Sequence, residues 1–131
     1  MSLLLRPAQT TDCHPTHRWH VDPTVRAVSR IKAPLDYPDH CRWFWGILDD
    51  PTVRVSILEL DGEPIGMVRV DCLEMSWVVD AEHRGKGYGT EMVRLALLLE
   101  GPHVYAVIGD GNAASRRVAE KAGVEVRRLV D

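Results

Sequence analysis

The stretch HRGKGYGTEMV, residues 83–93, decides how this chain is interpreted. It places glycines at positions 85, 87 and 89 and continues directly into apolar sequence with helical spacing. Glycine weakens helices, so this cluster at a helix start indicates a loop whose backbone approaches another group closely. Free amides and the helix dipole favour an anion there, and Arg84 and Lys86 add positive charge. The stretch predicts a phosphate-binding loop, with a purely structural turn as the alternative.

Two common phosphate loops do not fit this spacing. The P-loop requires a lysine followed by Ser or Thr, whereas Lys86 is followed by Gly87. The dinucleotide fingerprint GxGxxG requires a glycine at position 90, where Thr90 stands. That fingerprint also belongs to the first strand–helix turn of its fold, whereas this loop lies two thirds of the way along the chain.

Composition limits the classes of protein to consider. The 131 residues match one domain, and 45% hydrophobic with 27% charged residues is typical of a globular chain. The formal net charge of -3 argues against nucleic acid or an anionic membrane as a general partner. The cysteines Cys13, Cys41 and Cys72 are scattered and odd in number, which indicates free thiols. With no signal peptide or long apolar run, we expect a cytoplasmic protein.

Hydrophobic periodicity outlines the remaining elements. Strands are expected at residues 3–6, 53–60, 64–71, 74–80, 103–108 and 124–130. Helical segments are expected from about residue 11, interrupted at Pro15 and before Asp22-Pro23, and again at 37–48, 89–100 and 112–122. The pentapeptide DPTVR occurs twice, entering a helix at 22–26 and a strand at 50–54. This order predicts an α/β (α+β) fold: a mixed, mostly antiparallel sheet of about six strands with helices on both faces.

The motif R-x-x-G-x-G at 84–89 resembles the pyrophosphate loop [QR]-x-x-G-x-[GA] of the GNAT superfamily of acetyl-CoA-dependent N-acetyltransferases. N-x-x-S at 112–115 and E-K-A-G at 120–123 resemble that superfamily's last helix. The resemblance covers nearly the whole chain. It implies one domain, residues 1–131, with an acceptor-side half at 1–73 and an acetyl-CoA-binding half at 74–131. It also implies that the fourth and fifth strands splay apart.

The resemblance assigns roles on the cofactor side. Amides of residues 84–90 would surround the pyrophosphate of acetyl-CoA, with Arg84 as counter-charge, and a Cβ at position 87 or 89 would hold the phosphate away. The backbone of Val78 and Val79 would pair with the pantetheine arm and donate to the thioester oxygen. Asn112 would brace the opening between the strands. The expected cofactor-binding residues are Val78, Val79, Arg84, Gly85, Lys86, Gly87, Tyr88, Gly89, Thr90, Asn112 and Ser115.

Acetyl transfer needs a neutral amine and a protonated leaving thiolate. At pH 7 about one molecule in six of an amine with a pKa of ~7.7 is neutral, against about one in 2,500 for a pKa of ~10.4. Glu74 can serve as the base, through a water, or it is an ordinary carboxylate at a strand end. Many GNAT members carry a tyrosine as acid where this chain has Ala119. Ser115 or Tyr105 would replace it; Ser115 can equally be a helix-turn hydroxyl.

The first half of the chain resembles a narrower group, the N-acetyltransferases of the pseudaminic-acid pathway, which acetylate an amino group on a UDP-linked deoxysugar. WHVDPTVRAVS, HCRWF, GEPIGMVRVD and EMSW carry this likeness, with His20 and Val21 in place of that group's Arg-Asn pair. The expected substrate-binding residues are Trp19, Arg26, His40, Arg69 and Ser76. Each has a plainer alternative, such as core packing for an aromatic ring, ion pairing for an arginine or helix capping for His40.

Two other functions stay open. Ribosomal-protein N-terminal acetyltransferases share the ending of the last helix and a similar layout. A catalytically weak acyl-CoA-binding module is suggested by Ala119. The expected partner is a small-molecule amine, with no nucleic acid and no membrane.

We expect no metal site, and we expect one edge of the sheet to be exposed. His14, His17 and His20 recur every three residues, but Pro15 is expected to break the helix that would align them, so we expect no bound metal. GNAT members commonly have a seventh strand, whereas this sequence ends at Asp131 after the sixth. The sixth strand would then be an exposed edge through which a homodimer forms.

Overall fold

The computed structural model describes residues 1–29 and 32–128, and within them one sheet follows the order of the chain. Its strands are β1 (Leu3–Pro7), β2 (Val53–Leu60), β3 (Glu63–Asp71), β4 (Glu74–Val79), β5 (Tyr105–Ile108) and β6 (Glu125–Arg128). The helices are α1 (Cys13–Val21), α2 (Pro23–Val28), α3 (Tyr37–Asp49), α4 (Tyr88–Glu100) and α5 (Ala113–Ala122), with short 3-10 turns η1 (Thr10–Asp12) and η2 (Ala81–His83). β1 to β4 are antiparallel, whereas β5 runs parallel to both neighbours. The expected fold class is confirmed.

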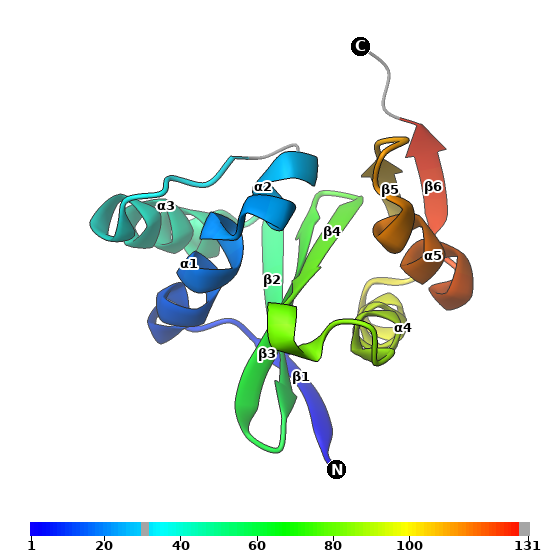
Figure 1. Cartoon of the computed structure of the whole chain (residues 1–131), viewed down its shortest axis with the longest axis horizontal. Coiled ribbons are helices and arrows are strands. Elements are labelled where there is room, and N and C mark those ends of the chain that lie inside the picture. Colours follow the sequence, from blue (N-terminus) through cyan, green and yellow to red (C-terminus); the bar gives the residue numbers. More distant parts are fainter. Residues whose placement is uncertain (30–31, 129–131) are drawn as a thin grey trace.

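The sheet opens between β4 and β5. These strands pair only at Glu74 and Tyr105, whereas the β3–β4 ladder runs from Gly66–Val79 to Asp71–Glu74. In Figure 1, β5 and β6 stand apart from the other four strands, and α2 lies on one side of the opening with α5 on the other. The expected splay is therefore present, and among the described residues one edge of β4 has no strand partner along most of its length.

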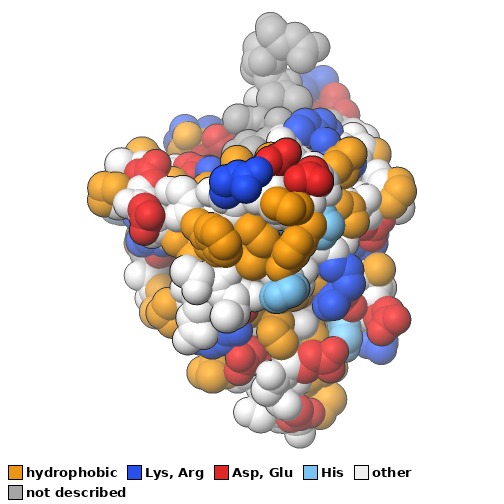
Figure 2. Space-filling view, turned by 90° about the vertical axis from the view of Figure 1, so that its left-hand side faces the viewer, with side chains coloured by type: hydrophobic (Ala, Val, Ile, Leu, Met, Phe, Trp, Pro, Cys, Tyr) orange, Lys and Arg blue, Asp and Glu red, His pale blue; other side chains and the backbone are white. Residues whose placement is uncertain are grey.

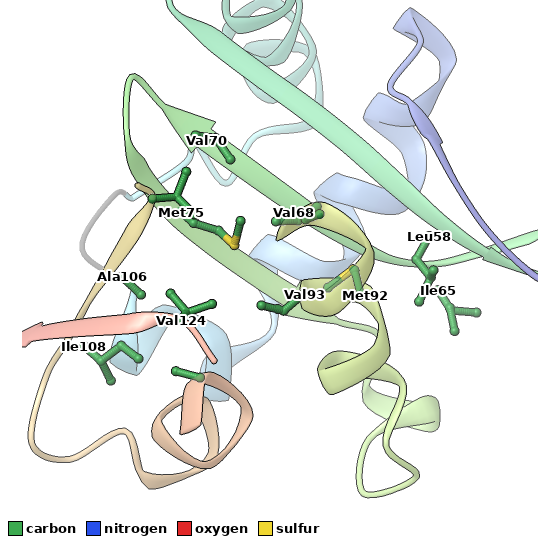
Figure 3. Close-up of a cluster of buried hydrophobic side chains, with 13 residues drawn as sticks. Leu58, Ile65, Val68, Val70, Met75, Met92, Val93, Ala106, Ile108 and Val124 are labelled. Atoms are coloured by element: carbon green, nitrogen blue, oxygen red, sulfur yellow. The ribbon is translucent and has the colours of Figure 1, made fainter. Parts of the chain in front are cut away.

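Two hydrophobic cores hold the layers together. One lies between the sheet and α4 with α5, where Met92 and Val93 of α4 face the apolar side chains of the sheet (Figure 3). The other lies beneath α1 and α3 and includes Phe44 and Ile57. At Gly66 a Cβ would lie 3.0 Å from Met92 Sδ and 3.1 Å from the Val78 carbonyl oxygen. Glycine at this position lets α4 cross the sheet closely, and this crossing fixes where α4 begins.

Most expected elements are found, with one clear correction. The expected interruption at Pro15 is wrong, because α1 continues through it. Pro15 is the third residue of the helix, where the missing N–H has no intrahelical partner to lose. The expected break before Pro23 is correct, because Asp22 ends α1 and caps α2. The predicted last strand extends to residue 130, and its residues 129–130 lie outside the described residues.

The outer side formed by α1 and α3 carries apolar side chains gathered beside histidines (Figure 2). Leu35, Tyr37 and Trp45 are exposed and belong to the segment that forms this side. The side chains of His14 and His17 both contact the Tyr37 ring. None of the helices in the described part of the chain is both long and apolar enough to span a bilayer.

Candidate active site

Two cavities meet where β4 and β5 separate. The larger, a groove of ≈ 660 Å³, is lined by α2, the end of β4, the loop at residues 83–90 and α5. The smaller, of ≈ 110 Å³, is lined by residues of α1, α2, α3, β3, β4, β5 and α5. Val28, Trp77, Asn112 and Ser115 line both cavities. A molecule in the groove can therefore present one end to a molecule in the smaller cavity.

The loop before α4 has the backbone conformation of an anion cradle. Gly85 and Gly87 have φ values of +75° and +86°, which side-chain-bearing residues rarely adopt. In the part of the chain that the structure describes, no atom apart from those of the glycine and its chain neighbours lies within 4 Å of a Cβ added at either position. Among the described residues, the amides of residues 85–87 form no backbone hydrogen bond. The first amides of α4 also lack intrahelical partners by helix geometry. These amides and the vacant space beside them fit a diphosphate.

Gly89 serves a different purpose. Its φ is not in the left-handed region, and an added Cβ would lie 3.4 Å from the Cγ2 atoms of both Val79 and Val118. Gly89 therefore lets the first turn of α4 pack against β4 and α5.

Arg84 lines the groove, but its guanidinium is already engaged by the protein. Nε donates to the Val79 carbonyl at 2.9 Å, Nη1 to Thr24 Oγ1 at 3.1 Å and Nη2 to Asp22 Oδ2 at 3.0 Å. Hydrogen bonds from Thr24, together with Arg84, hold the pKa of Asp22 below its usual value. The structure therefore gives Arg84 a bridging role between the loop and α2. Lys86 is exposed and does not line the groove.

Asp80 is a supporting residue that the sequence did not reveal. Although only 9% exposed, it accepts hydrogen bonds from Trp19 Nε1 at 3.0 Å and from the backbone amide of Glu82 at 3.2 Å. His83 Nδ1 also lies 3.0 Å from the Asp80 carboxylate, and Arg18 Nε lies 3.6 Å from it. Burial opposes ionisation of Asp80, yet these hydrogen bonds lower its pKa overall. Asp80 thereby ties α1 to the segment that leads into the glycine loop.

The open edge of β4 is formed by different residues from those expected. The Asp80 amide donates to the Ile65 carbonyl on β3, whereas the Leu73 carbonyl accepts from Tyr105 on β5. Because backbone groups alternate sides along a strand, the amide of Val78 points toward β3 and those of Trp77 and Val79 point toward the opening. Val78 and Val79 both line the groove, but of this expected pair only Val79 has its amide toward the opening, as does Trp77.

The smaller cavity brings together several residues that the sequence predicted. Arg69 and Ser76 are cross-strand neighbours, and Glu74 is paired with Asp71 at the end of the same ladder. Arg69 Nε donates to Asp71 Oδ1 at 3.0 Å, and its guanidinium lies 5.8 Å from the Trp43 ring centroid. Glu74, Arg69, Ser76 and Ser115 all line this cavity. They place a carboxylate, a cation and two hydroxyls around one small volume.

Four other expected site residues do not reach either cavity. Trp19 is 2% exposed and His40 is fully buried, so neither side chain can contact an acceptor. The ring of Tyr105 is covered by the Arg127 guanidinium at 3.7 Å, and Arg26 donates to the Ala33 carbonyl at 2.7 Å. These four residues pack or brace the fold here instead.

His20 lines the smaller cavity and was missed as a candidate. Its Nδ1 lies 2.7 Å from the Thr16 carbonyl oxygen, so this nitrogen donates and Nε2 is left as an acceptor. Burial is the main cause that lowers the pKa of His20, so the ring is neutral at pH 7. The signal in the sequence was its departure from the related group's Arg-Asn pair. No group of three or more His, Cys, Asp or Glu side chains in residues 1–29 and 32–128 is arranged to hold a metal ion.

Comparisons with known proteins show the family and the fold. A model of the acetyltransferase (GNAT) domain family matches residues 2–125. Among solved structures, the aminoglycoside acetyltransferase AAC(6')-Ib in complex with coenzyme A is 23% identical, with a TM-score of 0.73 over 93% of this chain and 83% of that one. The spermidine N-acetyltransferase from Vibrio cholerae, in complex with CoA and spermine, is 18% identical, with a TM-score of 0.80 over 92% of this chain and 79% of that one. No curated protein gave a significant match.

The solved structures share the fold of this chain. They do not single out the N-acetyltransferases of the pseudaminic-acid pathway. The family match, which spans nearly the whole sequence, is the decisive finding. The chain belongs to the acetyltransferase (GNAT) domain family.

Proposed function

We propose that this chain transfers an acetyl group from acetyl-CoA to the primary amine of a small molecule, by direct attack in a complex that holds both. Membership of the GNAT family makes it an acetyl-CoA-dependent N-acetyltransferase. The observation that carries the proposal is the shared wall of the two cavities at Trp77, Asn112 and Ser115. The cofactor arm and the acceptor amine can meet there without either leaving its cavity.

The residues at this junction suit the reaction. Glu74, in the smaller cavity, takes a proton from the acceptor ammonium, directly or through a water. The amides of Trp77 and Val79 point into the opening, where they can donate to the thioester oxygen as it gains charge. The Ser115 hydroxyl lies on the wall between the cavities and supplies the proton for the leaving sulfur. Bound coenzyme A provides the activated acetyl group.

The charge around the acceptor cavity favours one class of amine. Its described lining has a single carboxylate, Glu74, beside the guanidinium of Arg69 and the neutral ring of His20. A polycation such as spermine would need several carboxylates and would be repelled by Arg69. A monoamine that also carries an anionic group suits this cavity better. A nucleotide-linked amino sugar, which the first half of the sequence resembles, is such a molecule.

An acceptor screen tests the proposal. Thiol release from acetyl-CoA would be followed with UDP-linked amino sugars, amino acids, spermidine, kanamycin and peptides that carry ribosomal-protein N-termini. We expect turnover with anionic monoamines. Turnover restricted to the peptides would establish the N-terminal acetyltransferase alternative. Coenzyme A binding without turnover on any amine would establish the binding-module alternative.

Two further features are proposed with this function. The thiols Cys13, Cys41 and Cys72 are free, which suits the reducing cytoplasm. In the described part of the chain β6 lies at the edge of the sheet, and we propose that a homodimer pairs through it. A monomeric mass by light scattering would refute the dimer.

A further inference from the structure

The cations of the glycine loop do not account for the charge of the cofactor. Coenzyme A carries a diphosphate and a phosphate monoester, and the monoester alone contributes between one and two negative charges at pH 7. Of the two loop cations, Lys86 does not line the groove, and the guanidinium of Arg84 already donates to Val79, Thr24 and Asp22. The counter-charge must come from elsewhere.

Helix α5 supplies two other cations. Arg117 and Lys121 both line the groove, and because they are four residues apart they lie one above the other on the same face of the helix. Between them, Val118 lies 3.4 Å from the position of an added Cβ on Gly89, so this part of α5 lies beside the phosphate loop.

Unlike Arg94, Arg116 and Arg128, these two cations have no carboxylate partner among the residues that the structure describes. Arg116 on the same helix and Arg128 on β6 both pair with Asp110, and Arg94 on α4 pairs with Glu91. Within residues 1–29 and 32–128, neither Arg117 nor Lys121 forms an ion pair, and the groove lining contains no Asp or Glu. The chain as a whole has a net charge of -3, whereas the lining of the groove is positively charged. The positive charge is therefore specific to the groove.

We infer that Arg117 and Lys121 form the phosphate counter-charge site of the groove, while Arg84 serves to hold α2 to the loop. The inference rests on the proposed function, because it takes coenzyme A as the groove's ligand. It adds two binding residues outside the R-x-x-G-x-G motif and removes the motif's own cations from direct charge neutralisation. The loop amides then orient the diphosphate, and the side chains of α5 neutralise the phosphates.

The test compares binding of coenzyme A and of 3′-dephospho-coenzyme A by isothermal titration calorimetry. The variants are Arg117→Ala, Lys121→Ala and the double variant, with Lys86→Ala and Arg42→Ala as controls that remove the same charge. Arg42 lies on α3, where it pairs with Asp39. All four positions are exposed and outside the cores, so folding should persist, and circular dichroism would verify it.

We expect Arg117→Ala and Lys121→Ala each to weaken coenzyme A binding about tenfold, as expected for one charge-assisted contact. Both controls should bind coenzyme A with an affinity within about twofold of that of the wild type. Added salt should reduce the difference in affinity between the wild type and the double variant. A loss confined to coenzyme A places the pair at the 3′-phosphate, whereas equal losses for both ligands place it at the diphosphate; either result supports the site.

Double-variant affinity within twofold of the Arg42→Ala control would overturn the inference, as would a larger loss for Lys86→Ala than for the double variant. Failure of the wild-type protein to bind either ligand would instead refute the proposed function. The two failures are therefore distinguishable.

Discussion

The cofactor side and the acceptor side of this molecule are built in different ways. The cofactor loop presents backbone amides in a conformation that depends on Gly85 and Gly87. The acceptor cavity presents side chains from separate elements, including His20 of α1, Arg69 of β3 and Glu74 of β4. A backbone cradle is encoded within a few consecutive residues, whereas a side-chain site exists only after distant segments pack. This difference determines how each side should respond to substitution.

The cofactor side should be the more sensitive to a single change. Gly87→Val places a β-branched residue at a φ of +86° and adds atoms to the space beside the loop. We expect the affinity for coenzyme A to fall about 1,000-fold, because two or more charge-assisted amide contacts would be lost. Calorimetric titration would measure this.

Gly46→Ala is the matched control for that substitution. Gly46 lies in α3, and no atom lies within 4 Å of an added Cβ. Coenzyme A affinity should not change, and the free energy of unfolding should rise by up to about 1 kcal/mol. If Gly87→Val bound coenzyme A as well as Gly46→Ala, the loop would not be the cradle.

On the acceptor side, Glu74→Gln should separate chemistry from binding. We expect kcat to fall about 100-fold, the size typical of a general base, while coenzyme A affinity stays unchanged. The loss should be larger for an amine with a high pKa than for one that is already partly neutral at pH 7. Rates measured with two such acceptors would check this, and an equal loss for both would argue that Glu74 is structural.

The bridge between the two sides should have an intermediate effect. Asp22 Oδ1 caps α2, accepting from the Thr24 amide at 2.9 Å, while Oδ2 accepts from Arg84. Asp22→Asn keeps the capping oxygen and removes only the bridge. Because α2 contributes to both cavities, we expect the acceptor KM and the Kd for coenzyme A each to rise about fivefold, equivalent to roughly 1 kcal/mol.

The second DPTVR copy provides the control. Asp50 Oδ1 accepts from the Thr52 amide at 2.9 Å in the same way, but within the described residues no arginine hydrogen-bonds to Asp50. Asp50→Asn should leave both constants within twofold. Adding Arg84→Gln to Asp22→Asn should raise the KM and the Kd little more than either change alone, since both changes remove the same interaction. Fully additive losses would contradict the bridge.

The last expected effect concerns stability rather than binding. Burial lowers the pKa of His40 from 6.5 to about 4, with His20 and His17 adding to the shift. Between these values the unfolded chain binds more protons, so the stability present above pH 6.5 is lost as the pH falls toward 4. We expect this loss to be on the order of 2 kcal/mol.

Urea unfolding at several pH values would measure it. His40→Gln should flatten the pH dependence, whereas His103→Gln, at an exposed position, should leave it unchanged. An unchanged slope in His40→Gln would show that His40 does not carry the effect.

Most of the residues expected on the cofactor side line the groove, whereas two of the five expected substrate-binding residues line the smaller cavity. Gly85 and Gly87 could be recognised because a positive φ is a local requirement of the backbone, and glycine is the residue that meets it. Trp19 and His40 matched a motif, yet both are buried, since a motif does not state which face of a helix meets the core. Three other features depend on partners that are distant in the sequence. They are the amide direction at Trp77 and Val79, the bridge from Arg84 to α2, and the hydrogen bonds of Asp80.

The repeated pentapeptide shows where local determination ends. In both copies the aspartate accepts from the threonine amide and hydroxyl two residues on, at 2.9 and 2.8 Å in the first and at 2.9 and 2.7 Å in the second. The five residues by themselves determined this turn, because the side chain reaches its own backbone. The conformation beyond the turn was decided by tertiary structure: the chain continues as α2 after the first copy's turn, whereas after the second it pairs with β3 as β2. The same five residues therefore lead into a helix or a strand, depending on which surrounding structure satisfies the backbone hydrogen bonds and buries the apolar side chains.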